Sequence, residues 1–310
     1  MRSVHQLVIA AAVAAWVLGA PGAGAQPNRR GGSSHFDTTF AFNKSGEVQL
    51  SLPHGSIRVT GWTRAEARVI VESDAGPVNS SFSSNRIRLD ARALSFHGGS
   101  MRYDITVPIG VRVIAATTSG DINVSGTRGD VTLTTASGSI SASEASGRVE
   151  VEVVSGRLAL QRIAGTTHIS AISGSSTISD VAGDLDLTTI NGSVHIDAAE
   201  LANFRYKALN GSLDFAGTLA PDGRHTLESQ SGDMTLRVPA DLGATIDFTS
   251  FSGRLRSPDF SLTVGPGTIV GRGRMHDRET VTVNGGGAHI SINSFSGDVT
   301  LRRLATSARR

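Results

Sequence analysis

Histidine and carboxylate side chains are the residues of this chain whose types could do chemistry. The segment "RMHDRE" (274–279) places His276 beside Asp277 and Glu279. A second set occupies alternate positions of predicted strands, where the side chains should point outward: Asp184, Asp186, Asp214, His168 and His195. Enzymes that cleave polysaccharides need paired carboxylates, or a carboxylate with an arginine, in one groove. These residues are mostly on different strands and mixed with Ser and Thr. A charged loop and a solvated strand face explain them, so we predict no catalytic residues and no enzyme activity.

The spacing of glycine raises calcium binding as an alternative. Calcium-binding β-rolls repeat every nine residues with the pattern G-G-x-G-x-D-x-U-x, so that turn carbonyls and carboxylates enclose the ion. This chain has one glycine per unit at the repeating position. The next residue is acidic at Asp121 and Asp130 but basic at Arg148 and Arg157, where it would repel the ion. We therefore predict no metal site and no cofactor.

The glycine repeat itself predicts strands. Nine glycines from Gly120 to Gly192 recur at a constant spacing of nine residues. The second and fourth residues after each glycine are mostly aliphatic, as in Val149 and Val151, and the intervening positions are polar. This alternation is typical of a short strand with one buried face. One such strand cannot bury its apolar face alone, so the units must stack.

The residue before each glycine indicates how many strands complete one coil. Ser or Asn precedes every second glycine, at Ser119, Ser137, Ser155, Ser173 and Asn191. A pattern of 18 residues favours two strands per coil, and each coil should add about 4.8 Å along the stack. No aromatic residue lies between Tyr103 and Phe204, which favours a thin aliphatic interior. The predicted fold class is all-β: a flattened two-sheet parallel β-solenoid with about 18–22 residues per coil and an N-terminal β cap.

We expect a single β-solenoid domain over residues 36–304, divided into three regions. Residues 36–115 form the cap and irregular coils, residues 116–197 the regular repeats, and residues 198–304 widened coils. Beyond Gly192 the Ser/Asn–Gly pairs continue at Gly211, Gly232, Gly253 and Gly297, with steps of 19, 21, 21 and 44 residues. The step of 44 is interpreted as two consecutive coils of about 22 residues.

The widened coils add loops that we expect on one side of the solenoid: residues 220–225, 238–243 and 265–278. Insertions in repeat proteins gather on one face, which is often the binding face. The candidate binding residues are Asp222, Arg224, His225, Asp241, Arg272, Arg274 and His276. The arginines suit a partner that carries carboxylate or phosphate groups. A tolerated surface insertion is the alternative reading of these loops.

The two ends of the chain are expected to lie outside the fold. Residues 1–25 have the layout of a secretory signal peptide, with cleavage between Ala25 and Gln26. Its apolar run, Leu7 to Ala20, is shorter than the ~20 residues needed to span a bilayer. No second such run occurs, so the mature chain should have no transmembrane span. Residues 26–35 and 305–310 are predicted to be short tails.

The net charge and the absence of cysteine exclude a nucleic-acid-binding surface and covalent links through cysteine. Removal of the signal peptide takes Lys+Arg from 29 to 28 against 27 acidic residues, which predicts no basic surface for nucleic acid. The chain has no cysteine, so disulfides and lipid attachment through a cysteine are excluded. The fold must be held by its own core and hydrogen bonds.

Several stretches resemble a known family. "GEVQLSLPHGSIRVTGW", "YDITVPIGVRV" and "SQSGDMTLRVPADLGATIDFTSFSGRL" are similar to the exported bacterial putative-adhesin family, a β-solenoid domain of unknown function. The resemblance runs from about Phe36 to Leu304 and carries no catalytic motif. It implies an exported, periplasmic or extracellular, non-catalytic binding or structural module of the cell envelope. Its partner would be an envelope or surface component, a glycan or a protein, and the chain itself a monomer or weakly self-associating. A periplasmic component of envelope-stress sensing and a carbohydrate-active enzyme are the alternatives.

Overall fold

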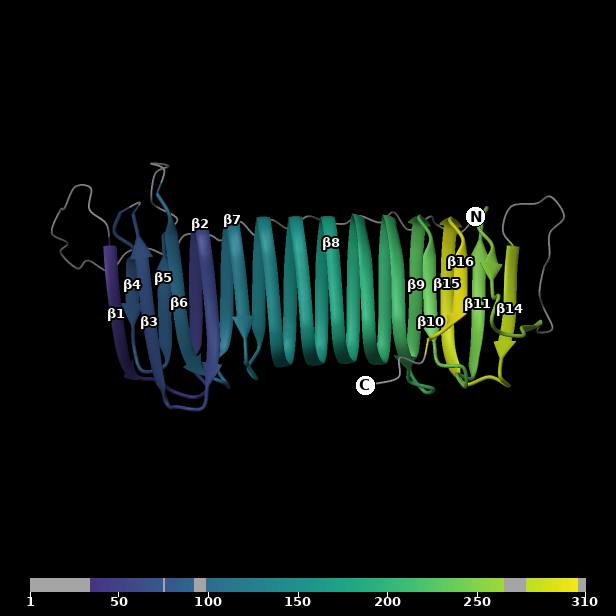
Figure 1. Ribbon diagram of the computed structural model, residues 1–310, viewed down its shortest axis with the longest axis horizontal. Helices are drawn as coiled ribbons and strands as arrows, with labels where there is room; N and C mark the ends of the chain where they lie inside the picture. Colours follow the sequence, from purple (N-terminus) through teal and green to yellow (C-terminus); the bar gives the residue numbers. More distant parts are fainter. Residues whose placement is uncertain (1–33, 75, 92–98, 265–276, 306–310) are drawn as a thin grey trace, which may run out of the picture. The chain divides into compact units, whose positions relative to one another are not determined.

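The computed structural model describes residues 34–74, 76–91, 99–264 and 277–305 (Figure 1). Every regular element among them is a β-strand, so the all-β prediction is confirmed. The strands are β1 (Ser34–Ala41), β2 (Glu47–Trp62), β3 (Glu66–Ser73), β4 (Asn79–Phe82), β5 (Arg86–Asp90), β6 (Met101–Pro108), β7 (Arg112–Ser125), β8 (Val131–Leu219), β9 (Arg224–Ser231), β10 (Met234–Val238), β11 (Ala244–Ser250), β12 (Leu255–Arg256), β13 (Thr263–Val264), β14 (Asp277–Val283), β15 (Ala288–Ser296) and β16 (Val299–Arg303).

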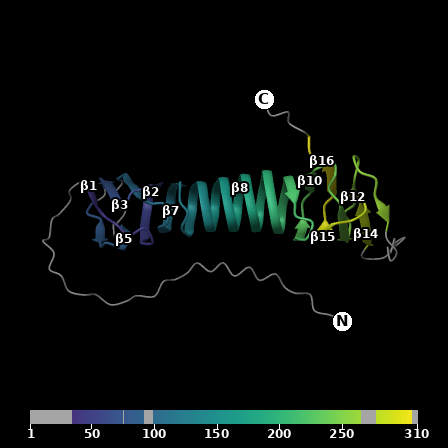
Figure 2. The same ribbon diagram turned by 90° about the horizontal axis from the view of Figure 1, so that it is seen from below.

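The pairing of β7 with β8 defines the repeating coil. Val113 pairs in parallel with Val131 and Ile122 with Ile140, so each stretch lies beside the one 18 residues later. Each coil runs along one sheet, bends at a glycine corner and returns along the other sheet. Figures 1 and 2 show the successive coils of β8 side by side. The predicted parallel β-solenoid with two strands per coil is confirmed.

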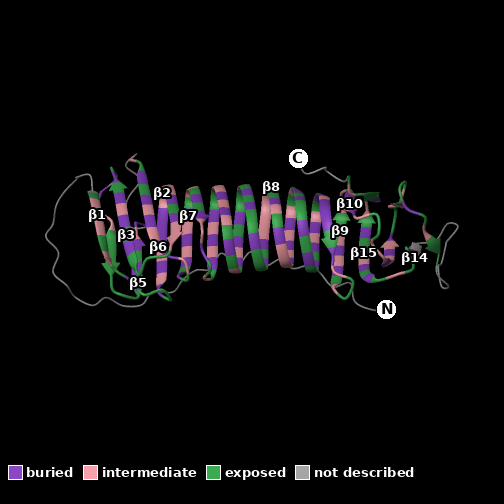
Figure 3. Cartoon of the chain, turned by 60° about the horizontal axis from the view of Figure 1, so that its bottom comes forward, coloured by how far each residue is buried: buried purple, intermediate pink, exposed green. Residues whose placement is uncertain are grey.

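Alternate residues of each strand face the interior, as the sequence pattern predicts. Val149 and Val151 are fully buried, whereas Glu150 between them is half-exposed. Figure 3 shows the same alternation of buried and exposed segments along the strands. Thr167 and Ser176, which interrupt the aliphatic positions, also face inward. Burial of these aliphatic side chains is the main favourable contribution to folding, at roughly 25 cal/mol per Å².

Close backbone approach at the corners explains the glycine period. A Cβ atom on Gly174 would lie 1.9 Å from the carbonyl oxygen of Gly156 in the preceding coil. At the opposite corner a Cβ on Gly183 would lie 2.3 Å from the carbonyl oxygen of Gly165. A side chain cannot be accommodated at either corner without moving the backbone. The nine-residue repeat is therefore a packing requirement.

The order of the last coils corrects the sequence interpretation. β9 pairs with β15, and β15 with β11, on one sheet; β10 pairs with β16, and β16 with β12, on the other. The coil formed by β15 and β16 therefore lies between two coils that precede it in the chain. The 44-residue step to Gly297 is not two consecutive coils, because the chain first adds β12, β13 and β14 further out and then returns to an inner position.

The N-terminal end has the same kind of crossing. β2 pairs in parallel with β7 on one side and with β5 and β6 on the other, so the first coil of the chain lies inside the second. Beyond them the strands become antiparallel: β3 pairs with β6, β1 with β3, and β4 with β5. This antiparallel region forms the predicted N-terminal cap. β14 pairs antiparallel with β11 and β13 at the other end, a second cap that the sequence analysis did not predict.

Candidate binding surfaces

Two of the three predicted loops lie on one side of the stack. Residues 220–223 join β8 to β9, and residues 239–243 join β10 to β11, along the lower edge of Figure 1. Asp222, Arg224 and Asp241 are exposed there. The backbone N–H of Arg224 donates to Oδ1 of Asn203 (3.0 Å), which ties the start of β9 to the preceding coil and leaves the guanidinium exposed.

His225 is not on the surface, and its assignment as an exposed loop residue is wrong. It belongs to β9 and is fully buried, paired in register with Phe204 on one side and Ile290 on the other. Its Nε2 lies 3.0 Å from the carbonyl oxygen of Ala220. Burial in this apolar stack lowers the pKa of His225. Its role is to fill the core.

The third insertion does not join the other two at its described end. Arg272, Arg274 and His276 lie outside the described residues. Asp277, which begins β14, pairs with Ser250, and this puts it at the Ser–Gly corner, across the coil from residues 220–223. The expected grouping of all three loops on one side is therefore not reproduced by the part of the chain that the structure describes.

The outward carboxylates and histidines bind each other across neighbouring coils. His168 Nδ1 is 3.8 Å from Asp186, and His195 Nδ1 is 3.3 Å from Asp214. Asp184 accepts a hydrogen bond from the side chain of Asn203 at 2.7 Å. These contacts form inter-coil ladders on the two faces.

The aspartates that follow the corner glycines have a structural role. Oδ1 of Asp121 accepts from the backbone N–H of Ser139 at 3.0 Å, one coil further on. Oδ1 of Asp233 does the same, accepting at 2.8 Å from the backbone N–H of Asp298, which lies in the next coil in space. These bonds satisfy backbone donors at the bends. Within the described residues no group of three or more His, Asp or Glu side chains is arranged to hold a metal ion.

A line of apolar side chains runs along the Ser–Gly corner; three of them are exposed, and Ile172, Ile190 and Leu209 are half-buried. Each member stands two residues before a corner glycine, and neighbouring glycines are stacked in space. We call this line the apolar ridge; its members, in spatial order, are Val154, Ile172, Ile190, Leu209, Phe295 and Phe251, with Gln230 between Leu209 and Phe295. Val154, Phe295 and Phe251 are 42%, 52% and 44% exposed. The ring centroids of Phe295 and Phe251 are 4.7 Å apart and parallel.

The ridge has a neutral polar border on its glycine side. Ser or Asn follows every ridge position; Asn210 donates from its side-chain amide to that of Asn191 at 3.1 Å. Sequence analysis missed the ridge, although its signal is in the repeat. The position before the Ser/Asn–Gly pair changes from Thr118 and Ala136 to Val, Ile, Ile and Leu, and to Phe after the interruption at Gln230.

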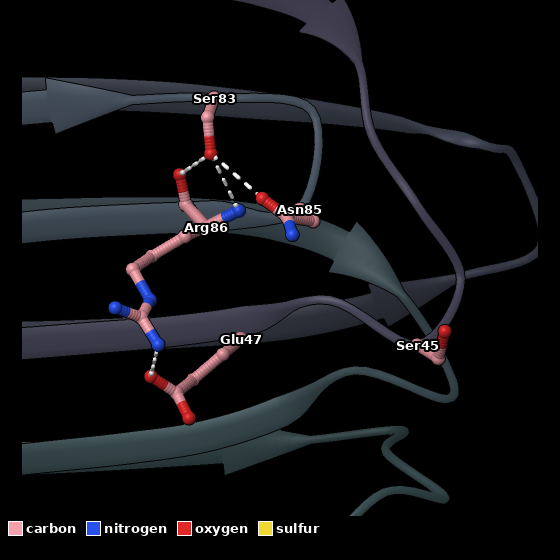
Figure 4. Close-up of a pocket in the computed structure, with 5 residues that line it drawn as sticks. All are labelled: Ser45, Glu47, Ser83, Asn85 and Arg86. Atoms are coloured by element: carbon pink, nitrogen blue, oxygen red, sulfur yellow. Dashed lines mark hydrogen bonds and ion pairs between the residues drawn. The ribbon is translucent and has the colours of Figure 1, made fainter.

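A shallow depression at the N-terminal cap is lined by Ser45, Glu47, Ser83, Asn85 and Arg86 (Figure 4). Four of these five residues, all but Ser45, are bonded to one another. Ser83 Oγ lies 3.0 Å from Asn85 Oδ1 and accepts from the N–H of Arg86 at 3.0 Å, and Arg86 pairs with Glu47 at 3.3 Å. The arrangement fixes the turn between β4 and β5 against β2.

Comparisons with known proteins place the chain in a family. A solved structure described as a putative cell adhesion protein from Clostridium sporogenes shares 10% identity, over 87% of this chain and 100% of that one, with a TM-score of 0.22. That score is too low to carry an argument. No curated protein matches the chain. Within its described residues no helix is long and apolar enough to cross a membrane.

The model of the family described as Toastrack DUF4097 matches residues 28–302. The chain therefore belongs to the Toastrack family of β-solenoid domains, as the resemblance in its sequence implies.

Proposed function

We propose that this protein is an exported, adhesin-like binding or structural module of the cell envelope, and that it acts without catalysis. The apolar ridge is the observation that carries the proposal. A row of apolar side chains that stay exposed or half-exposed on a polar surface is typical of interaction sites, although Gln230 divides this row between Leu209 and Phe295. The ridge covers six inter-coil steps, roughly 29 Å at 4.8 Å per step, and is held by a rigid stack.

The ridge favours a partner with apolar surface, and of the envelope components considered we favour a protein. Export rests on the signal-peptide pattern of residues 1–25, which lie outside the described residues. The exposed charges of Asp222, Arg224 and Asp241 form a second, competing surface on the opposite corner of the coil. The two surfaces can be separated by mutation because they lie on different bends of the chain.

Binding of the mature chain to isolated envelope fractions tests the proposal. The triple variant Val154→Thr, Ile172→Thr and Ile190→Thr keeps β-branched side chains while removing apolar surface. We expect it to reduce the bound fraction about tenfold with little change in melting temperature. Arg148→Ser, which follows Gly147 at the opposite corner of the coil, is the control and should bind normally.

The variant Arg224→Ser, Arg272→Ser and Arg274→Ser tests the competing loops. Loss of binding in this variant with full binding in the ridge variant would move the site to the loops. Full binding by both variants would overturn the ridge as the binding surface.

A further inference from the structure

β1 is the outermost strand of its sheet at the N-terminal end. It pairs with β3 on its inner side, and no other described strand pairs with its outer edge. The sequence of β1, "SHFDTTFA", contains no Pro, Gly or Lys, the residues that usually protect an edge. Its acidic residue, Asp37, is held by two hydrogen bonds from Arg68 of β3, at 3.0 and 2.6 Å. These bonds keep the pKa of Asp37 below its usual range.

The inner face of this edge is aromatic and only partly covered. Phe36 and Phe40 of β1 contact Phe82 of β4, with ring centroids 5.9 and 5.6 Å apart. Phe36 and Phe40 are half-buried, and Phe82 is 37% exposed. The interior of the stack thus ends in an aromatic cluster that lacks a further layer within the described residues.

The C-terminal end differs. β14 has a partner on each side, β11 and β13, although β13 covers it only at Val281 and Thr282. Glu279, near the start of β14, is charged, and charged residues discourage edge pairing. The N-terminal edge is therefore the one suited to association.

The sequence of β1 is self-complementary about Thr38. In an antiparallel pair centred on this residue, Phe36 of one copy lies opposite Phe40 of the other, and Asp37 lies opposite Thr39. Inward residues then meet inward residues. Centring the pair on Asp37 would instead place the two carboxylates opposite each other, which is unfavourable. We propose that two copies of this chain associate head to head by antiparallel pairing of their β1 edges, with Thr38 on the two-fold axis.

Substitutions at Thr39 test this register. Thr39 is exposed, and within the monomer it pairs with Arg68 of β3. Thr39→Asp would place two like-charged pairs across the proposed interface, facing Asp37, and should raise the dimer dissociation constant about tenfold. Thr39→Lys would create two opposite-charge pairs there and should lower it about threefold.

The same substitutions have the reverse effect within the monomer. Aspartate at position 39 lies beside Arg68 and should leave the fold as stable or more stable, whereas lysine there is repelled. Affinity and fold stability therefore move in opposite directions, which separates an interface effect from damage to β1.

Sedimentation of the mature chain over a concentration series measures the dimer, and chemical unfolding measures the fold. Thr177→Asp, at an exposed position in the middle of β8, is the control and should leave the dissociation constant unchanged. A mature chain that stays monomeric throughout would overturn the proposal. So would a dimer whose affinity is insensitive to Thr39, or follows fold stability across the variants.

Discussion

His225 is an ionisable side chain that the fold buries in its apolar interior. The residue faces the interior of its coil, where its neighbours in register are Phe204 and Ile290. Nε2 contacts the carbonyl oxygen of Ala220, while Nδ1 has no hydrogen-bond partner among the described residues. Desolvation disfavours the charged ring, so the folded protein holds His225 neutral.

This placement predicts a loss of stability in mild acid. The unfolded chain takes up a proton at His225 near the ordinary pKa of about 6.5, whereas the folded chain resists protonation. The stability that the fold gains from a neutral His225 is therefore fully present above about pH 6.5. It is lost as the pH falls toward the lower pKa of His225 in the folded state. Urea unfolding from about pH 7.5 to about pH 5.5 should show this loss. His225→Leu should show a smaller one; equal losses in both proteins would contradict the assignment.

At the scale of the strand and its bend, one corner position is left-handed in each regular coil. Gly126, Glu144, Arg162, Asp180 and Ala198 recur every 18 residues with φ between 51° and 68°. Only the first is glycine. Glu144 and Arg162 form an ion pair at 2.9 Å between adjacent coils, while Ala198 has no polar side chain to offset the strain.

Ala198→Gly is therefore expected to stabilise the protein by about 1 kcal/mol, because glycine adopts this conformation without a Cβ clash. Thermal unfolding measures the change. Ala159→Gly provides the matched control, since Ala159 is exposed within a strand and the same change there should destabilise by about 0.5–1 kcal/mol. A lower melting temperature for Ala198→Gly would show that the bend is not strained.

The elements also show what the sequence can and cannot predict. Gly174 and the alternation around Val151 depend on local spacing, so the coil and its inward face were predictable. His225 was misplaced because the widened coil blurs the register that aligns it with Phe204. The order of the last coils was not predictable, because "SFSG" occurs at both 250–253 and 294–297. Two rungs with the same corner motif are interchangeable by pattern, and the connecting segments decide their order.

For the whole molecule, the crossed connections make one late segment central to the C-terminal stack. β15 lies between β9 and β11 and pairs with both, and β16 lies between β10 and β12 and pairs with both. Deletion of residues 286–310 removes both strands, so β9 and β10 each lose one neighbour. Hydrogen exchange should become much faster in β9 and β10 of this variant, and its soluble yield should fall.

Deletion of residues 306–310 alone is the control for that experiment. It leaves β15 and β16 intact and should exchange like the full chain. Unchanged protection of β9 and β10 after the longer deletion would contradict the inner position of the final coil.

The inner position of β15 and β16 also means that the C-terminal part of the stack cannot form fully before these two strands are present. A chain is synthesised from its N-terminus, so β15 and β16 are made after β11 and β12, yet they supply a rung that lies inside them in the stack. Until they arrive, β9 and β10 keep unpaired backbone edges toward the missing rung, and β11 and β12 have no rung on which to dock. Chaperones and proteases recognise such exposed edges in unfinished or cleaved chains. A product shortened by a few dozen residues would thus be removed, and the surviving molecules would be those that carry the whole stack.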